Sequence, residues 1–590
     1  MGHIISNIQI KNFKSVKNQE FDLSAFSPLI GYNNAGKSNI LEAIKWVLRK
    51  TSLKKDSFND ITQPIIMIGK IEGITTDILD NIDPVHRTRI VPFLNNETLT
   101  IKRIQTSPSQ SAAQIQLQVL DPTDGTTWQN NPTGIDNAIK DLFPEPIHIG
   151  AMENSEDDIS KSSTSSTIGK LLAEIIEPIE LQYGQQVNTA LNGLKEILDA
   201  EGIQRAPELT TFDQEINEKL EAFFPDIKVK VHIPTPELKE VFKKGTIKVY
   251  ENLLPTPKDV SLLGHGAQRS IQMTLIRHLA DLKLISQENR TTTLLLIDEP
   301  ELYLHPQAIE ILRNSLKVLS NQGYQVIFST HSPFMITQKD VGNTILIRKN
   351  DALGTYKRTT LKSAIPIVEQ EASHQLTLLY SLSNSSNILF SEKVILTEGK
   401  TENKLLPIII EKVTGKTILY HKAALVKLDG SGNTKKTMRV LTTMDLPTKA
   451  IVDLDFALKN GIREGYLQAD DADIISCLAE ITNLAAGNNI AIGSDGWPTS
   501  SNGSISAAAG FSILAQSTNT EDNIINICAK MKDHNIWVWK HGTIEDQLDL
   551  DGKSEAIWAA FNESLEQSDL ETILPVKHQD IEDCINWLLD

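Results

Sequence analysis

The sequence predicts an α/β protein made of two successive α/β parts, the first of which is interrupted by helices. Residues 4–13 alternate apolar and polar side chains like a strand. Residues 27–50 run from an apolar strand through a Gly- and Asn-rich loop into an amphipathic helix. Residues 168–224 carry mainly helical patterns, and residues 391–590 return to alternating strands and helices, which is the pattern of α/β layers.

The size and composition are those of a multidomain globular protein. A chain of 590 residues is too long for one core, and 40% hydrophobic and 22% charged residues are ordinary values. Three well-separated cysteines form no zinc motif and suit a reducing compartment. No apolar stretch is long enough to span a membrane, so we expect a cytoplasmic protein with no membrane partner.

The formal net charge of −18 excludes a nucleic-acid binder that is basic overall. Binding depends on local charge, however, and the chain has two basic clusters. These clusters are Arg49, Lys50, Lys54 and Lys55, and later Lys435, Lys436 and Arg439. Taken alone, each cluster is better explained as a solvated surface.

The loop that begins at Gly31 has the pattern of a phosphate-binding loop. Gly31-Tyr-Asn-Asn-Ala-Gly36-Lys37-Ser38 fits G-x-x-x-x-G-K-[ST] between a strand and a helix. In such a loop backbone N–H groups surround phosphate oxygens, Lys37 supplies positive charge, and Ser38 offers its hydroxyl to Mg²⁺. The sequence therefore predicts an ATP site, with Asn34 and Asn39 as further contacts.

Three later segments follow in the order of an ABC-type ATPase, which the first half of the chain resembles. Asp298 and Glu299 end a hydrophobic strand, where an aspartate can hold Mg²⁺ and a glutamate can polarise water. His331 follows another strand, where it could sense the γ-phosphate. Each signal alone has a structural explanation, as a helix cap, a surface turn or a core histidine.

Gly264–Arg269 opens a helix at the place of the signature motif of ABC-type proteins, although it lacks the usual serine. The resemblance implies that Gly266 contacts a nucleotide held by a second copy of the chain. We therefore expect a homodimer or a higher homo-oligomer, with the helical insertion as a dimerisation element.

A second set of acids comes late in the chain. Glu398 and Gly399 end an apolar run at 393–397, and Glu402 follows one helical turn on. Asp453 and Asp455 are two residues apart in a later strand-like run, so both are expected on one face.

Glu545 completes this set after a further strand and turn. Taken singly, Glu402 could be a solvated helix face, Asp455 a strand-end cap, and Glu545 a first-turn acid favoured by the helix dipole. Taken together, carboxylates in one pocket repel by about 4 kcal/mol per pair at 4 Å unless a cation lies between them. An oxygen-only ligand set suits Mg²⁺ or Mn²⁺, and two such ions can promote phosphodiester displacement.

The motifs E-G-x-x-E and D-x-D resemble a Toprim domain, and an ABC-type ATPase followed by Toprim resembles the OLD (overcoming lysogenization defect) family. The resemblance implies that Glu398, Asp453 and Asp455 bind the first ion, that Glu398 helps deprotonate water, and that Glu402 and Glu545 serve the second. It also implies a late lysine that stabilises the transition state. Lys577 matches it best, and Lys540 is the competing candidate.

A glycine turn with Gly430 and Gly432, followed by Lys435 and Lys436, resembles a segment of the family that could approach a phosphate backbone. The expected domains are an ATPase N-terminal part at 1–153, a helical dimerisation insertion at 154–250, an ATPase C-terminal part at 251–345, a linker at 346–390 and a Toprim nuclease domain at 391–590.

The expected function is that of an ATP-regulated, divalent-metal-dependent DNA endonuclease in antiphage defence. Proteins of this layout often act beside a helicase or a retron reverse transcriptase with its DNA. The alternative is a RecF- or SMC-like DNA-maintenance ATPase whose Toprim half only binds nucleic acid. Against an SMC rod, the insertion holds only short helical pieces rather than long heptad repeats.

Overall fold

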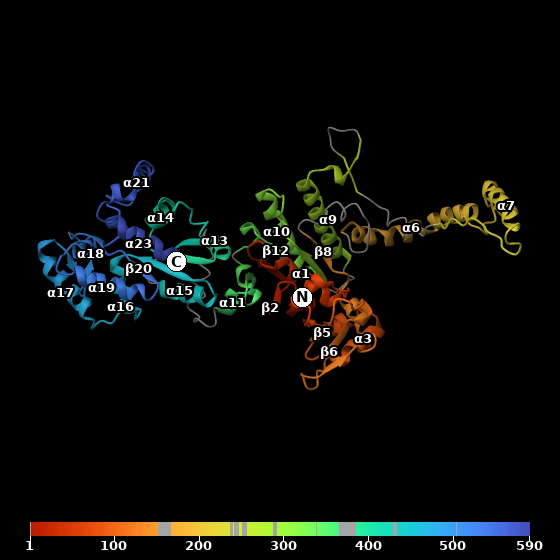
Figure 1. The fold of residues 1–590 in the computed structure, drawn as a ribbon, viewed down its shortest axis with the longest axis horizontal. Helices are drawn as coiled ribbons and strands as arrows, with labels where there is room; N and C mark the ends of the chain where they lie inside the picture. The colour runs from red at the N-terminus through yellow and green to blue at the C-terminus, as the bar shows by residue number, and fades with distance from the viewer. Residues whose placement is uncertain are drawn as a thin grey trace. The chain divides into compact units, whose positions relative to one another are not determined.

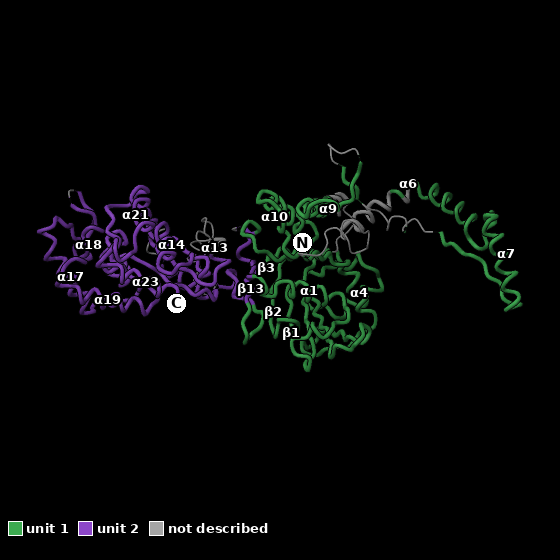
Figure 2. Tube along the Cα trace, turned by 45° about the horizontal axis from the view of Figure 1, so that its top comes forward, with its two compact units in different colours: residues 1–29, 33–335, 349–356 green, residues 30–32, 336–348, 357–590 purple. Residues whose placement is uncertain are grey.

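The computed structural model describes residues 2–150, 167–235, 240, 247–250, 256–286, 292–337, 339–364, 385–428, 434–502 and 504–590. The chain forms two compact units (Figure 2). Unit 1 comprises residues 1–29, 33–335 and 349–356, and unit 2 comprises residues 30–32, 336–348 and 357–590. Across the described ranges, no helix has the length and apolar character needed to cross a membrane.

Unit 1 is built on a large mixed sheet (Figure 1). Its antiparallel part has the order β7-β6-β5-β4-β1-β2, and its parallel part has the order β12-β11-β8. The strands are β1 (Ile4–Phe13), β2 (Val16–Asp22), β3 (Phe26–Ile30), β4 (Ile65–Glu72), β5 (Leu99–Gln105), β6 (Gln116–Leu120), β7 (Trp128–Asn130), β8 (Ile147–Ile149), β11 (Thr293–Ile297) and β12 (Tyr324–Thr330), with β9 (Lys248–Val249) and β10 (Lys258–Asp259) as a separate pair.

Helix α1 (Lys37–Leu48) of unit 1 buries an apolar face against this sheet. Ile40, Ile44 and Val47 of the helix after the phosphate loop are fully buried, and Val47 packs over Gly69 of β4. The parallel strands β11 and β12 are buried along their whole length, as expected for strands covered on both faces. The helices are α1 (Lys37–Leu48), α2 (Thr76–Leu79), α3 (Pro84–Ile90), α4 (Ile135–Leu142), α6 (Thr167–Leu198), α7 (Pro207–Glu221), α9 (His265–Ser286) and α10 (Pro306–Ser320).

The expected helical insertion contains α6 and α7. Residues 154–167 form a polar, low-complexity sequence that predicts a mobile loop, and they lie outside the described residues except for Thr167. Residues 368–383 have a helix-like sequence and also lie outside the described residues. The start of the expected linker is structured, because it forms β13 (Ile345–Asn350) and β14 (Gly354–Lys357), and Gly354 of β14 pairs with Val16 of β2.

Unit 2 is built on a four-stranded parallel sheet of order β16-β15-β17-β20. Its strands are β15 (Lys393–Thr397), β16 (Ala423–Lys427), β17 (Thr448–Val452) and β20 (Ile536–Val538), with β18 (Ala491–Ile492) and β19 (Pro498–Thr499) as a separate pair. Its helices are α11 (Leu361–Ala364), α13 (Ser385–Phe390), α14 (Lys400–Thr414), α15 (Thr434–Thr443), α16 (Gly461–Arg463), α17 (Ala472–Gly487), α18 (Ala507–Ala515), α19 (Glu521–Lys532), α20 (Ile544–Gln547), α21 (Glu555–Gln567), α22 (Leu570–Ile573) and α23 (His578–Leu589).

The parallel sheet lies between two apolar layers, because successive side chains of a strand point to opposite faces. Val394 and Leu396 of β15 join the core that contains residues of α15 and α19. Ile395, between them, joins the core that contains residues of α14, α21 and α23. Both faces of the sheet are therefore covered, and the ends of its strands remain accessible.

Candidate functional site

Three parallel strands of unit 2 end at the same edge of the sheet, and each is followed by an acid. Glu398 follows β15 directly, Asp453 follows β17 directly, and Glu545 lies in α20 after β20. The carboxyl edge of a parallel sheet is where α/β proteins bind their ligands. The fold therefore brings together acids that are almost 150 residues apart in the chain.

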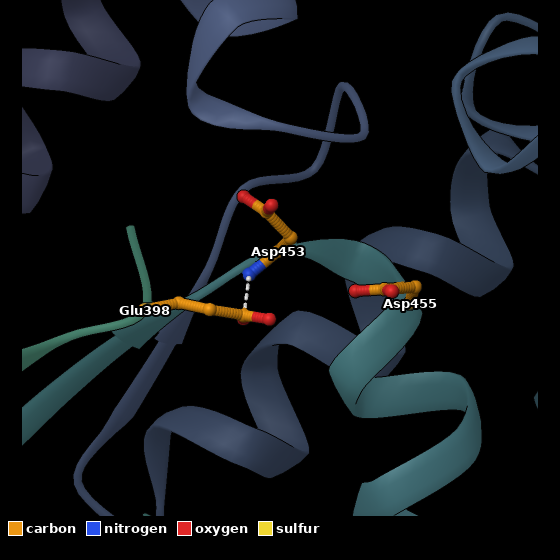
Figure 3. A group of neighbouring side chains, drawn as sticks. All are labelled: Glu398, Asp453 and Asp455. Atoms are coloured by element: carbon orange, nitrogen blue, oxygen red, sulfur yellow. Dashed lines mark hydrogen bonds between the residues drawn. The ribbon is translucent and has the colours of Figure 1, made fainter. Parts of the chain in front are cut away.

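Glu398, Asp453 and Asp455 form the centre of this edge (Figure 3). One carboxylate oxygen from each lies within 4.8 Å of the others. The backbone N–H of Asp453 donates to Glu398 Oε2 at 3.3 Å, and Ile544 N–H donates to Asp453 Oδ1 at 3.3 Å. These bonds hold two of the three carboxylates in fixed positions.

Asp453 and Asp455 do not lie on a strand, which corrects the expectation from their spacing. β17 ends at Val452, and Asp455 has helical backbone angles (φ −63, ψ −32) at the start of a π-helix, Phe456–Asn460. Asp455 instead reaches the site from this turn, and Figure 3 shows its carboxylate facing that of Glu398. π-Helical segments occur frequently at functional sites.

Gly399 provides space for Glu402. Its φ of −119 is extended, so the turn does not require a glycine for its conformation. A Cβ at Gly399 would lie 2.7 Å from Glu402 Oε2, which is too close. Glu402 itself is only 2% exposed and lies in the first turn of α14.

Glu545 is held beside Glu402 by two partners. Thr401 Oγ1 donates to Glu545 Oε1 at 2.5 Å, and Lys553 Nζ lies 3.2 Å from Glu545 Oε2. Lys553 comes from the loop between α20 and α21. Its side chain is 62% exposed, whereas that of Glu545 is 8% exposed.

Burial and mutual repulsion disfavour the charged forms of these acids. Burial, then the charge of Asp455, raises the pKa of Glu398 to about 7. Burial, then the charge of Glu545, raises the pKa of Glu402 to about 7. Burial raises the pKa of Asp455, and burial with the neighbouring carboxylates raises that of Asp453 well above its ordinary value. A cation in this pocket would remove the penalty.

The donor set fits divalent metal ions. The group consists of carboxylate oxygens alone, which suits Mg²⁺ or Mn²⁺ better than zinc or copper. Its members are half-buried and close enough to share an ion, unlike acids on a solvated helix face. Glu402 and Glu545 lie beside the first three and extend the oxygen-rich pocket.

The structure places the two candidate lysines against other groups. Lys577 Nζ donates to Asp546 O and to Asp549 Oδ1, both at 2.5 Å. Lys540 Nζ lies 2.6 Å from Asp580 Oδ2. Lys553 is instead the basic residue whose charge acts on Glu398, Glu402, Asp453 and Asp455. Sequence reasoning missed it, although it follows Glu545 by eight residues in the same chain segment.

The expected phosphate-contacting turn with Gly430 and Gly432 lies outside the described residues. Of the two lysines beyond it, Lys435 donates to the backbone carbonyl of Glu464 and lies 5.2 Å from the Tyr466 ring centroid.

In unit 1, the phosphate loop leads directly into α1. Gly36 has φ +102, which favours glycine, and a Cβ there would lie 2.1 Å from Thr355 Oγ1. Thr355 Oγ1 in turn donates to Ala35 O at 2.7 Å. Asn34 is exposed in the loop with φ 66, and the side chain of Asn39 donates to Ser15 Oγ at 2.7 Å.

Ser38 and Asp298 are in contact. Ser38 Oγ donates to Asp298 Oδ2 at 2.5 Å, and Ser329 Oγ donates to Asp298 Oδ1. A hydroxyl and a carboxylate so placed can hold the Mg²⁺ of a bound nucleotide. Glu299 follows with φ 47, a left-handed conformation fixed by its N–H bond to Ser329 Oγ at 3.0 Å.

His331 connects the phosphate loop to Glu299. Its Nε2 lies 2.7 Å from Lys37 Nζ and 3.1 Å from Glu299 Oε1. Because an ammonium can only donate, Nε2 accepts from Lys37 and the imidazole is neutral, so the approach of Nε2 to Glu299 is a contact and not a hydrogen bond. Burial, then the charge of Lys37, lowers the pKa of His331 in agreement with this assignment.

Glu301 is a further residue that sequence reasoning missed. Its Oε1 accepts from His331 N–H at 2.9 Å, from Ser332 N–H at 3.2 Å and from Thr330 Oγ1 at 2.7 Å. Burial raises the pKa of Glu301. Its carboxylate therefore fixes the turn that carries His331.

The expected signature segment opens helix α9, as predicted. Arg269 is buried and donates to Asp298 O at 3.2 Å and Glu299 O at 3.1 Å, so α9 is tied to the end of β11. A Cβ at Gly266 would lie 2.9 Å from the backbone oxygen of Tyr303. Gly266 therefore permits close packing within the chain.

Comparison with known proteins assigns both halves of the chain. An "AAA ATPase domain" model matches residues 4–147 and 95–336, and an "Overcoming lysogenization defect protein-like, TOPRIM domain" model matches residues 389–455. The Old nuclease of Escherichia phage P2 is 37% identical over 99% of this chain and 99% of that protein.

Two further relatives are more distant. Endonuclease GajA of Bacillus cereus is 24% identical over 69% of this chain and 68% of its own, and the OLD nuclease of Thermus scotoductus is 22% identical over 67% and 72%. With an ATPase domain followed by a Toprim domain and full-length similarity to the Old nuclease, the chain belongs to the OLD (overcoming lysogenization defect) family of nucleases.

Proposed function

We propose that this protein is an ATP-regulated, divalent-metal-dependent DNA endonuclease with a two-metal Toprim site. The observation that carries the proposal is the convergence of Glu398, Asp453 and Asp455 within 4.8 Å at the carboxyl edge of a parallel sheet, beside Glu402 and Glu545. Burial raises the pKa values of these acids and disfavours their charged forms. Carboxylates with only a structural role would therefore not be stabilised by this placement.

The residues of the site have separate tasks in this proposal. Glu398, Asp453 and Asp455 hold the first ion, Glu402 and Glu545 hold the second, and Glu398 accepts a proton from the attacking water. When bound, two such ions stabilise negative charge on the attacking and leaving oxygens of a phosphodiester. Lys577, with Lys540 as the competing candidate, stabilises the transition state, and Lys553, which pairs with Glu545, is a further candidate for contact with the phosphate that reacts.

In unit 1, Lys37 contacts the β- and γ-phosphates of ATP, with Asn34, Gly36 and Asn39 as further contacts. Ser38 and Asp298 hold the nucleotide's Mg²⁺. Glu299 polarises the attacking water, and neutral His331 senses the γ-phosphate. Gly266 contacts a nucleotide held by a second copy, which makes the protein a homodimer or a higher homo-oligomer.

In this proposal the chain divides into an ATPase, a helical dimerisation insertion, a linker and a Toprim nuclease domain. The biological role that we propose is antiphage defence with DNA as the substrate, beside a partner such as a helicase or a retron reverse transcriptase with its DNA. Similarity to the Old nuclease and to endonuclease GajA supports a nucleic acid as the substrate.

Plasmid cleavage tests the nuclease proposal. Supercoiled DNA is incubated with Mg²⁺ or Mn²⁺ and with the wild type, Glu398→Ala or Glu566→Ala, where Glu566 is an exposed glutamate of α21. We expect the wild type and Glu566→Ala to cut alike, and Glu398→Ala to lose about a hundredfold or more in rate. Cleavage that survives Glu398→Ala would exclude the Toprim site as the nuclease centre.

The same assay tests regulation by ATP. We expect ATP to change the cleavage rate of the wild type, and this change to disappear in Lys37→Ala. An ATP response that is equal in both proteins would contradict regulation through the phosphate loop.

A further inference from the structure

Lys553 places a positive charge beside the carboxylates that would hold the second ion. Its Nζ lies 3.2 Å from Glu545 Oε2, and Thr401 already bonds the other oxygen of that carboxylate. The side chain of Glu545 is 8% exposed, whereas that of Lys553 is 62% exposed. The ammonium group thus reaches into the pocket from a solvent-exposed stem.

The positive charge of Lys553 acts on several acids of the site. It favours the charged forms of Glu398, Glu402, Asp453 and Asp455, in addition to its ion pair with Glu545. The strongest effects of these acids on Lys553 itself come from Glu545, Asp453 and Glu402. Lys553 therefore pairs directly with Glu545, and the charges of Asp453 and Glu402 also act on it.

We propose that Lys553 takes the place of the second cation in the metal-free protein, so that the two ions bind in order. The first ion enters among Glu398, Asp453 and Asp455, where no ammonium pairs directly with the described carboxylates. The second ion must displace the Lys553 ammonium from Glu545. This inference rests on the proposed two-metal function and specifies how its second site is filled.

The geometry suits displacement rather than a permanent ion pair. The lysine approaches from a loop, and most of its side chain is exposed, so it can leave with little loss of packing. The Thr401 bond keeps Glu545 in place when the lysine departs. A released ammonium would remain near the pocket, where it can pair with a DNA phosphate.

Manganese binding to the full-length, nucleotide-free protein tests the proposal without measuring cleavage. Titration calorimetry and the electron paramagnetic resonance signal of free Mn²⁺ give the number and strength of the sites. The proteins are the wild type, Lys553→Met, Lys553→Gln and the control Lys412→Met. In the wild type, Lys412 of α14 pairs with Asp569 outside the site. Glu398→Ala and Glu402→Gln identify the first and second sites.

We expect Lys553→Met and Lys553→Gln to bind the second Mn²⁺ about fivefold more tightly than the wild type, because the competing ion pair is lost. The first site should be unchanged, and Lys412→Met should match the wild type. Equal or weaker binding at the second site in both Lys553 variants would overturn the inference and leave the nuclease proposal intact. If Glu398→Ala removes no Mn²⁺ site, this result would instead contradict the proposed function itself.

Discussion

Thr401 donates a hydrogen bond of 2.5 Å to Glu545, from the first turn of one helix to the first turn of another. Helix α14 follows β15 and α20 follows β20, and β17 lies between these two strands. The bond therefore spans the carboxyl edge of the sheet and closes the acidic pocket on one side. Both residues are buried, with 1% of Thr401 and 6% of Glu545 exposed.

Replacement of Thr401 by valine removes this bond while keeping the shape of the side chain. We expect DNA cleavage to fall by about ten- to a hundredfold, the range found when a partner of a metal ligand is lost. Thr401→Ser keeps the hydroxyl and serves as the control. If Thr401→Val cuts DNA as well as Thr401→Ser does, Glu545 does not depend on this bond for its position.

Gly399→Ala tests the space that Glu402 occupies. The added Cβ would meet Glu402 Oε2 at 2.7 Å, so the carboxylate must move although the backbone tolerates alanine. We expect weaker Mn²⁺ binding and about tenfold slower cleavage. Gly487→Ala, where nothing lies within 4 Å of the new Cβ, is the matched control. Unchanged metal binding in Gly399→Ala would show that Glu402 is not a ligand.

The raised pKa values predict that the metal-free protein loses stability as pH rises. Glu398 and Glu402 have pKa values of about 7 in the folded state against ordinary values of 4.5. Between these values the folded state holds protons that the unfolded state has released, so stability falls as pH increases through this window. We expect the thermal midpoint of the nuclease half to drop between about pH 5 and pH 8.

Added Mn²⁺ should raise that midpoint more at the higher pH, because protons compete with the ion at the lower pH. In a Glu398→Gln, Glu402→Gln double variant, both the pH dependence and the effect of Mn²⁺ should shrink. A wild-type midpoint that rises across the same interval would contradict the assigned burial of these charges.

Glu301 provides a test in the ATPase half. Its Oε1 accepts from the N–H groups of His331 and Ser332, so removal of this acceptor should misplace His331. We expect Glu301→Ala to lower kcat for ATP hydrolysis by about tenfold with little change in KM. Glu301→Gln keeps an acceptor oxygen and should restore most of kcat. Equal losses in both variants would show that His331 is not positioned through this contact.

Much of the fold could be predicted from local patterns. Lys37 and Ser38 lie in a strand–loop–helix pattern. The apolar runs before Glu398 and Asp453 indicated two strands that end at the same edge of a parallel sheet. The positions of Asp453 and Asp455 were predicted less well. Their spacing suggested a strand, but β17 ends at Val452, and local spacing does not show where a strand gives way to a helical turn.

The lysine beside the acids could not be predicted, because its position depends on tertiary packing. Lys540, Lys553 and Lys577 all follow late strands or turns, and the resemblance to the family favoured Lys577 without pointing to Lys553. The fold pairs Lys540 with Asp580 and Lys577 with Asp549, which leaves Lys553 to face Glu545. The role of Gly399 also depends on tertiary packing, since this glycine leaves the space that the Glu402 carboxylate occupies.

Anomalous diffraction from crystals grown with Mn²⁺ tests the central claim most directly. The account predicts two manganese peaks in the nuclease half, one bound by Glu398, Asp453 and Asp455 and the other by Glu402 and Glu545, with Lys553 moved away from Glu545. Crystals that bind Mn²⁺ elsewhere, with these five carboxylates free of metal, would contradict it.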